Sequence, residues 1–206
     1  MLTIHHLGVS QSERIVWLCE ELGLPYELKR YVRRADNSFA PDEYKALHPA
    51  QTAPIITDGA LSLAESGAIC DYIVTRYGGG RLVPAPDSPD FAHHLFWFHF
   101  SNGSFMAILL ADLALTMAGV VERPQFVQDR KERAWALANA HLQQHPWFGG
   151  SDISSADIMM GFVLTTMLVF SGTTLERYPA IEAYVQRIKA RPAYQRAMAA
   201  AEPEGI

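Results

Sequence analysis

The chain has 206 residues, of which 49% are hydrophobic and 19% are charged, and its formal net charge is −5. This composition is ordinary for a globular protein with an ample core, and it gives no reason to expect nucleic acid, which requires a clustered basic face. The two cysteines, Cys19 and Cys70, stand outside any C-x-x-C motif, which argues against a disulfide scaffold and indicates a reducing compartment.

The N-terminus and the apolar stretches of the sequence predict a cytoplasmic protein without a membrane segment. Residues 1–6 lack the positive charge and the long apolar run of a secretory signal. The most apolar stretch, residues 105–121, is interrupted by Asp112 and is short for a helix that spans a bilayer. We therefore expect neither nucleic acid nor a membrane among the partners of this protein.

The first part of the chain alternates between short apolar runs and helical patterns. Asp58 and Gly59 stand between two apolar runs, which is the signal of a two-residue β-hairpin. Gly23 stops the first helical pattern, as glycine often does. In chain order we expect a strand at residues 2–6, a helix at 12–22, a strand at 26–32, a short helix from 41, the hairpin, and a helix at 66–77. Crossover helices between strands predict a mixed sheet with helices on its faces.

Glycine and proline mark residues 79–89 as a linker, and no convincing strand pattern follows it. The helical patterns beyond it run over residues 90–117, 124–145, 154–170, 178–190 and 193–200. The sequence therefore predicts an α/β N-terminal domain of residues 1–78 and an all-helical C-terminal domain of residues 90–206.

Ser10 and Glu13 form an S-x-x-E pattern at the start of the first predicted helix. The structural interpretation is a capping box, in which the Ser10 hydroxyl caps the helix. The functional interpretation uses the same position, because a hydroxyl at the positive end of a helix can donate a hydrogen bond to a thiolate and lower the pKa of the thiol. The residues alone leave both interpretations open.

A second set of candidate residues comprises Ala53-Pro54 beside a predicted strand and Glu65-Ser66 at a helix start. A helix N-terminus presents free N–H groups and a positive dipole end, so it can hold an anion. An X-Pro bond next to a strand end is also a place where a cis bond is tolerated. These features indicate a site for a small peptide-like molecule with a carboxylate. The alternatives are an ordinary N-cap at Ser66 and an ordinary trans bond at Pro54.

Ser154 and Asp157 form a second capping box, S-x-x-D, and the flanking Ile153 and Ile158 are placed as a hydrophobic staple. Both features are typical of a helix start. We therefore predict that Asp157 stabilises its helix and takes no part in chemistry.

The histidines give no expected metal site. His93, His94 and His99 lie in one predicted helix, but none of them is spaced i, i+4 from another, so they cannot share a helix face as zinc ligands do. The adjacent pair at residues 5–6 is likewise not expected to bind a metal.

Taken together, these residues resemble a cytosolic glutathione transferase, and the likeness covers nearly the whole chain. The most similar branch is the serine-type enzymes of bacteria and fungi. Each motif alone is weak, but their combination is specific. The matching segments are residues 10–14, 16–26, 48–54, 63–69 and 97–104, together with the box at 154–157.

The resemblance implies a thioredoxin-like N-terminal domain that holds glutathione and a helical C-terminal domain that supplies most of the second-substrate pocket. It implies a cis bond before Pro54, with the backbone of Ala53 pairing with the cysteinyl part of glutathione as a short strand would. It places Glu65 and Ser66 at the γ-glutamyl end and Gln51 near the glycine carboxylate.

The resemblance also implies which hydroxyl is catalytic. In serine-type members the activating serine lies four residues before an arginine of the first helix, which here selects Ser10 ahead of Arg14, with Ser12 as the rival. The implied protein is a homodimeric detoxification enzyme without a metal, in which the thiolate of glutathione attacks a small, hydrophobic electrophile. Glutathione-dependent peroxide reduction and non-catalytic ligand binding are the alternatives for the same fold.

Overall fold

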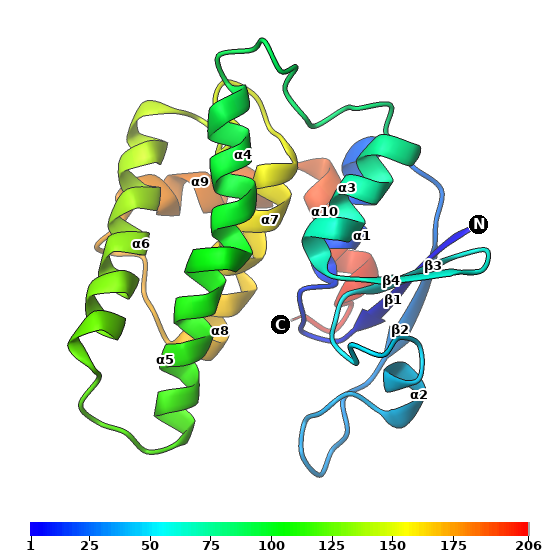
Figure 1. The fold of residues 1–206 in the computed structure, drawn as a ribbon, viewed down its shortest axis with the longest axis horizontal. Helices are drawn as coiled ribbons and strands as arrows, with labels where there is room; N and C mark the ends of the chain where they lie inside the picture. The colour runs from blue at the N-terminus through cyan, green and yellow to red at the C-terminus, as the bar shows by residue number, and fades with distance from the viewer. Residues whose placement is uncertain (206) are drawn as a thin grey trace. The chain divides into compact units, whose positions relative to one another are not determined.

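The computed structural model describes residues 1–205, which form two compact units. The first unit contains Met1–Leu82 and the residues from Lys189 onwards, and the second contains Val83–Ile188. Figure 1 shows that the sheet belongs to the first unit, whereas the second is built from helices.

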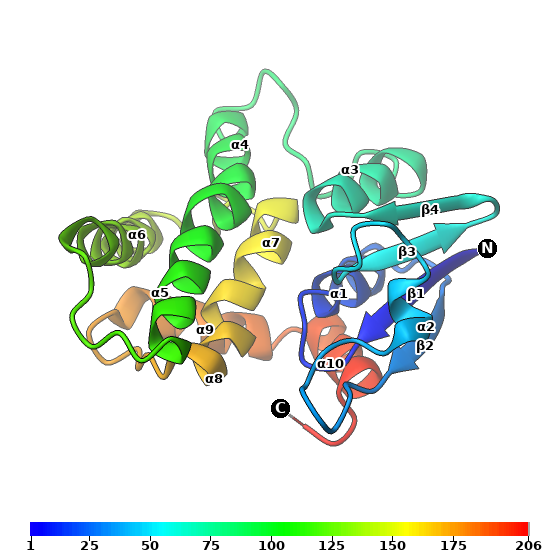
Figure 2. The same ribbon diagram turned by 60° about the horizontal axis from the view of Figure 1, so that its bottom comes forward.

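The first unit is built on a mixed four-stranded sheet with the order β2-β1-β3-β4 (Figure 2). Strands β1 and β2 pair in parallel, whereas β3 is antiparallel to both β1 and β4. This is the mixed sheet with crossover helices that the sequence predicts. Its elements are β1 (Leu2–Leu7), α1 (Glu13–Leu22), β2 (Glu27–Tyr31), α2 (Asp42–Lys45), β3 (Ile55–Asp58), β4 (Leu61–Ala64), α3 (Ser66–Arg76) and α10 (Pro192–Ala201).

Successive residues of a strand point to opposite faces of the sheet, and both faces of this sheet are covered. On one face, Tyr44 of α2 packs in a buried cluster with Leu7 of β1 and Ile55 of β3. Ile4 and Ile56 point to the other side and are completely buried. Helices α1 and α3 pack against each other and against the sheet.

Two glycines define turns in this unit. Gly23 ends α1 with a φ of 62°, as predicted. The hairpin turn consists of Gly59 and Ala60 and not of Asp58 and Gly59, because Asp58 still pairs with Leu61. Gly59 has a φ of 60°, the left-handed conformation that a tight hairpin turn requires.

The last helix, α10, packs on α1 within the first unit. Trp17 and Tyr194 meet edge to face with ring centroids 5.1 Å apart. Arg191 donates two hydrogen bonds of 2.7 and 2.8 Å to the carboxylate of Glu21. The aromatic contact and the bidentate ion pair hold α10 on the α/β unit. The sequence prediction grouped all of residues 90–206 together, because contacts between such distant segments leave no local pattern in the sequence.

The second unit is helical, with the elements α4 (Phe91–Phe100), the π-helix η1 (Ser101–Met106), α5 (Ala107–Met117), α6 (Gln125–Gln144), α7 (Ser155–Leu164), α8 (Thr166–Ser171) and α9 (Pro179–Lys189). Elements α4, η1 and α5 form one continuous run, Phe91–Met117, which is long and apolar enough to cross a membrane by length and composition alone. A single helix of this kind is weak evidence for a membrane span, because core helices of soluble proteins meet the same criteria.

The helical pattern over residues 154–170 is divided into α7 and α8 at Thr165. The Thr165 hydroxyl donates a hydrogen bond of 2.8 Å to the carbonyl of Gly161, four residues earlier. A threonine that bonds the i−4 carbonyl competes with the helical hydrogen bonds and bends a helix. The backbone of Thr165 accordingly leaves the helical region, with φ −122° and ψ −89°.

Asp157 is the centre of a buried hydrogen-bond network at the start of α7. Ser154 and Asp157 form the predicted capping box. The Asp157 carboxylate also accepts hydrogen bonds from the backbone N–H of Phe148 at 2.7 Å and from the hydroxyl of Tyr184 at 2.9 Å. Burial raises the pKa of Asp157 to about 6, although these hydrogen bonds act to lower it. The carboxylate thus joins α7 to the preceding loop and to α9.

Asp157→Ala is expected to lower the free energy of unfolding by at least about 3 kcal/mol, because it leaves several buried donors without an acceptor. Urea unfolding followed by circular dichroism measures this loss. The matched control is Asp152→Ala, which removes an exposed carboxylate from the same loop and should change stability by less than about 0.5 kcal/mol. Equal stability of the two variants would contradict the structural role of Asp157.

Candidate active site at one edge of the sheet

The register of the strands brings the predicted site residues to one edge of the sheet. His5 near the end of β1 pairs with Ile55 at the start of β3, and Ile55 pairs with Ala64 at the end of β4. The segments that adjoin these strand ends, residues 8–12, 51–54 and 65–66, therefore lie at the same edge. They contain all the residues that the sequence analysis selected for a ligand and its activation.

Each of these three segments holds a non-glycine residue with a positive φ. Val9 has a φ of 49°, Gln51 of 55° and Glu65 of 72°. Elsewhere among the described residues, only Ser38 and Leu82 share this property. The conformation costs on the order of 1–3 kcal/mol for a residue with a side chain, and most for a β-branched one such as Val9. Strained backbone of this kind clusters at ligand sites, which makes this edge the leading candidate.

Ser10 does not cap α1, so the structure excludes the capping-box interpretation of the S-x-x-E pattern. Helix α1 begins at Glu13, and the N-cap position is Ser12, because the chain first turns through Gln11 and Ser12. The Ser10 hydroxyl donates a hydrogen bond of 2.6 Å to the carbonyl of Leu7. It also accepts a weaker one of 3.3 Å from the Ser12 N–H. Ser10 retains 6% of its surface exposed, at the start of the turn into the helix.

Ser12 is fully buried and is engaged by the fold. Its hydroxyl oxygen accepts a hydrogen bond of 3.2 Å from the Leu7 N–H and lies 2.8 Å from His6 Nδ1 and 2.7 Å from Ser10 Oγ. His6 Nε2 lies 2.9 Å from the carboxylate of Glu202, which can only accept, so this nitrogen carries the proton. Burial lowers the pKa of His6. In the neutral ring, Nδ1 accepts a hydrogen bond from the Ser12 hydroxyl.

Arg14 connects two of the three segments. Its side chain is buried, and Nη1 donates hydrogen bonds to Gln11 Oε1 at 2.5 Å and to Ser66 Oγ at 3.0 Å. Burial lowers the pKa of Arg14 to about 10, so the guanidinium stays charged at neutral pH. In the sequence, Arg14 serves only to locate Ser10. Its bridging role depends on a contact between residues 52 positions apart, for which the sequence gives no local signal.

The start of α3 has the properties of an anion site. Glu65 occupies the N-cap position with its side chain exposed, and Ser66 is the first helical residue. The first bond of the helix runs from the Ile69 N–H to the Glu65 carbonyl, so the amides of residues 66–68 precede the helical ladder, at the end of a helix where an anion can bind.

The segment of residues 51–54 contains the remaining residues predicted to bind the ligand, Gln51, Ala53 and Pro54. The Ala53–Pro54 bond is cis, as the resemblance implies, and it leads directly into β3. Gln51 is exposed, and its N–H donates a hydrogen bond of 3.0 Å to the carbonyl of His48 in the preceding turn.

Neither cysteine of the chain supplies a reactive thiolate at this edge. Cys19 and Cys70 are buried, and burial raises the pKa of each thiol to about 12. Since a thiolate is the reactive form of cysteine, neither side chain is a nucleophile at neutral pH. A reacting sulfur at this site would have to come from a ligand.

Comparison with known protein families gives matches in both halves of the chain. Residues 5–81 match the family model described as glutathione S-transferase, N-terminal domain, and residues 105–192 match the model of the C-terminal domain.

Individual relatives agree with these models. Glutathione S-transferase 3 of Schizosaccharomyces pombe is 33% identical over 177 residues, which cover 79% of this chain and 72% of that protein. The disulfide-bond oxidoreductase YfcG of Escherichia coli is 26% identical over 98% of this chain and 96% of its own. The crystal structure of a glutathione S-transferase from Actinobacillus pleuropneumoniae superposes with a TM-score of 0.85 at 35% identity, covering 96% of this chain and 91% of that one.

Proposed function

The chain belongs to the glutathione S-transferase family and is a glutathione transferase, and we propose that glutathione binds at the sheet edge where residues 8–12, 51–54 and 65–66 meet. Glu65 and Ser66 hold the γ-glutamyl end, the backbone of Ala53 pairs with the cysteinyl part, and Gln51 lies near the glycine carboxylate. The observation that carries this proposal is the convergence of three strained segments beside a helix N-terminus.

The chemistry of glutathione suits this edge. Its γ-glutamyl carboxylate is an anion, and the amides at the start of α3 are hydrogen-bond donors at the positive end of a helix dipole. Its cysteinyl part has peptide N–H and C=O groups that can pair with extended backbone next to Pro54. A ligand held at both ends in this way has its sulfur placed between them, toward the β1–α1 turn.

Ser10 is the residue that we propose to activate the sulfur. Its hydroxyl turns from the Leu7 carbonyl to donate a hydrogen bond to the thiolate, while the thiol proton passes to solvent. The thiolate then attacks the electrophile, forming the carbon–sulfur bond as the leaving group departs. Each unit by which the thiol pKa falls requires about 1.4 kcal/mol of thiolate stabilisation, and a hydrogen bond to a charged group provides about 1.5–3 kcal/mol.

The hydrogen bonds of Ser12 support Ser10 over its rival. The Ser12 hydroxyl is fully buried, and its proton is directed to His6. A thiolate could reach it only if this network were broken. Ser12 therefore acts as a structural residue that fixes the turn in which Ser10 lies.

We further propose that the protein is a cytoplasmic homodimer that detoxifies small hydrophobic electrophiles. Leu95 and Phe96 on α4 keep 42% and 48% of their surface exposed, which supports burial of this helix in a subunit interface, since obligate interfaces are apolar. The experiment that tests the activity is glutathione-dependent consumption of an activated aryl halide by the purified protein. No feature favours peroxide reduction or non-catalytic binding over transfer.

Glu65→Gln is expected to weaken the binding of S-hexylglutathione by about tenfold or more, because the variant loses a charge-assisted contact with the α-amino group of the γ-glutamyl end. Isothermal titration calorimetry measures this change. Glu43→Gln, which neutralises an exposed acid on α2 of the same unit, is the matched control and should bind normally. Wild-type affinity in Glu65→Gln would remove Glu65 from the site.

Ser10→Ala is expected to shift the pH–rate profile to higher pH and to lower turnover at neutral pH by about tenfold or more, because the thiolate loses its donor. The affinity for glutathione should change little, since the ends of the tripeptide are held elsewhere. Steady-state kinetics from about pH 6 to about pH 9, a range around neutrality and the thiol pKa, give the pH–rate profile and the apparent affinity for glutathione.

Ser12→Ala is the control for this experiment, with the folded fraction of each variant checked by circular dichroism. We expect Ser12→Ala to be less stable and to keep the wild-type pH profile. A shifted profile in Ser12→Ala together with an unshifted one in Ser10→Ala would transfer the activating role to Ser12.

A further inference from the structure

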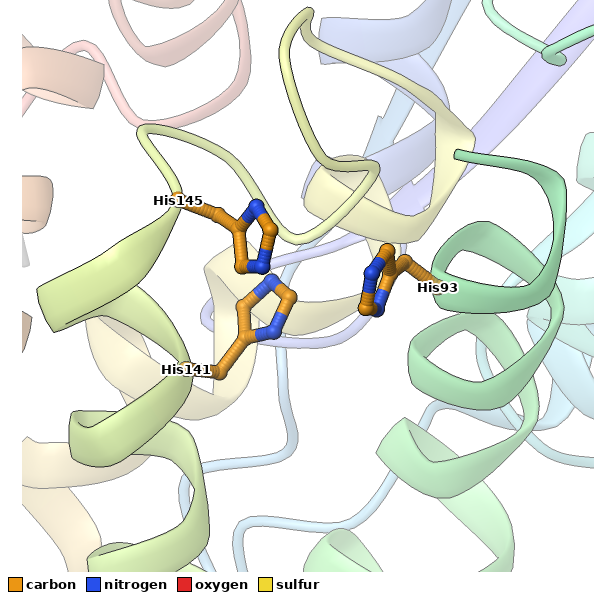
Figure 3. A group of neighbouring side chains, drawn as sticks. All are labelled: His93, His141 and His145. Carbon is orange, nitrogen blue, oxygen red and sulfur yellow. The ribbon is translucent and has the colours of Figure 1, made fainter. Parts of the chain in front are cut away.

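Three histidines of the second unit form a cluster, and none of them is among the residues assigned to glutathione. His93 lies in the first turn of α4, and His141 and His145 lie at the end of α6. One ring nitrogen from each residue lies within 4.8 Å of the corresponding nitrogens of the other two. Figure 3 shows the three rings pointing toward one another from these two helices.

The helix geometry explains how the cluster forms. His141 lies in the last turn of α6, and His145 is the residue that follows the helix; its N–H still bonds the His141 carbonyl, so the i, i+4 spacing brings the two residues together. Their rings stack with centroids 4.6 Å apart, and the His93 ring lies 4.6 Å from that of His145. The histidines of the predicted helix at residues 90–117 show no i, i+4 spacing, whereas the pair at residues 141 and 145, which was overlooked, does. That pair has the spacing that marks metal ligands on a helix.

The protonation of His141 suits a ligand. Its Nε2 lies 3.0 Å from the backbone carbonyl of Trp147, which can only accept, so Nε2 carries the proton. With the proton on Nε2, Nδ1 is left with the lone pair that a metal ion requires. Histidine ligands of metals characteristically donate their other N–H to a carbonyl or carboxylate in this manner.

The surroundings of the cluster add negative charge and space. The Asp90 carboxylate, one turn before His93, interacts electrostatically with both His93 and His145, and it is held by the Ser151 N–H at 3.0 Å. His93 and His141 also line a cavity of about 310 Å³ together with Trp97. A metal ligand such as water has room on this side.

We propose that His93, His141 and His145 form a binding site for one divalent transition-metal ion of borderline softness, represented by Zn²⁺. Imidazole nitrogens suit zinc, copper and nickel, whereas magnesium and calcium prefer oxygen ligands. Zinc–nitrogen bonds of about 2.0–2.1 Å place tetrahedral ligand nitrogens roughly 3.4 Å apart. The ring nitrogens now lie up to 4.8 Å apart. Rotation of the partly exposed rings that moves each nitrogen by about 1 Å is enough to bring them to the tetrahedral spacing.

Such an ion would join the first turn of α4 to the last turn of α6. It would stabilise the helical unit, because the free energy of binding to the folded state adds to the free energy of unfolding. The three protein ligands leave a fourth position for water on the cavity side. The site uses no residue of the proposed transferase mechanism, so its test is independent of transferase activity.

The test uses the untagged full-length protein, freed of metal with a chelator and titrated with ZnCl₂ by calorimetry. We expect one Zn²⁺ per chain and a higher melting temperature with zinc than without. Co²⁺ should give the visible absorption of a tetrahedral site with nitrogen ligands. The double variant His141→Ala/His145→Ala should lose about 100-fold or more in zinc affinity, and His93→Asn about tenfold or more.

His99→Ala is the matched control, because it removes an exposed histidine of α4 outside the cluster. It should bind zinc with wild-type affinity, and circular dichroism should show that each variant is folded. Absence of zinc binding by the wild-type protein, or equal zinc affinity in the wild type and the double variant, would overturn the proposal. The cluster would then be a set of stacked neutral rings that pack α4 against α6.

Discussion

The pairing of β3 with both β1 and β4 is the constraint on which the candidate active site depends. Ile55 is paired on one side with His5 and on the other with Ala64. This register brings the end of β1, the start of β3 and the end of β4 to one edge. A shift by one residue would exchange the layers that Ile55 and Ile56 face. It would disrupt the packing of both side chains, which are now completely buried. Burial of the core thus fixes the position of the site.

Polar groups buried beneath this edge add a second constraint. Arg14 holds Gln11 and Ser66, and Ser12 holds the end of β1 and the ring of His6. A buried charge that loses its partners costs about 3–5 kcal/mol, so Arg14 strongly favours the one arrangement that satisfies it. Since the positive φ values of Val9 and Glu65 lie beside these contacts, we infer that the buried network maintains the strained backbone that the ligand meets.

The features that were predictable from the sequence are those with a local signal. Alternation of strand and helix patterns gave the mixed sheet, Gly23 gave the end of α1, and the Ser154–Asp157 spacing gave the capping box. The same kind of local reasoning failed at Ser10, where an S-x-x-E pattern occurs but the chain makes an additional turn before the helix begins. A short motif does not show which buried groups form hydrogen bonds with a hydroxyl, and here the Ser10 hydroxyl bonds the Leu7 carbonyl.

The features that could not be predicted depend on contacts between distant residues. The packing of Tyr194 on Trp17 assigns α10 to the α/β unit, and the contact of Arg14 with Ser66 joins α1 to α3. The histidine cluster is intermediate, because the spacing of His141 and His145 is visible in the sequence but the approach of His93 is not. The residues proposed to bind the ligand were selected by the resemblance of their motifs, and the register of the sheet explains why those motifs lie at one place.

The most direct test of the proposed site is a crystal structure of the protein with S-hexylglutathione. The sulfur should lie within about 3.5 Å of the Ser10 hydroxyl oxygen, at hydrogen-bond distance. The γ-glutamyl carboxylate should contact the amides at the start of α3, and the cysteinyl backbone should pair with Ala53. A tripeptide bound away from this edge, or a sulfur held by another hydroxyl while Ser10 remains bonded to Leu7, would contradict the proposed site.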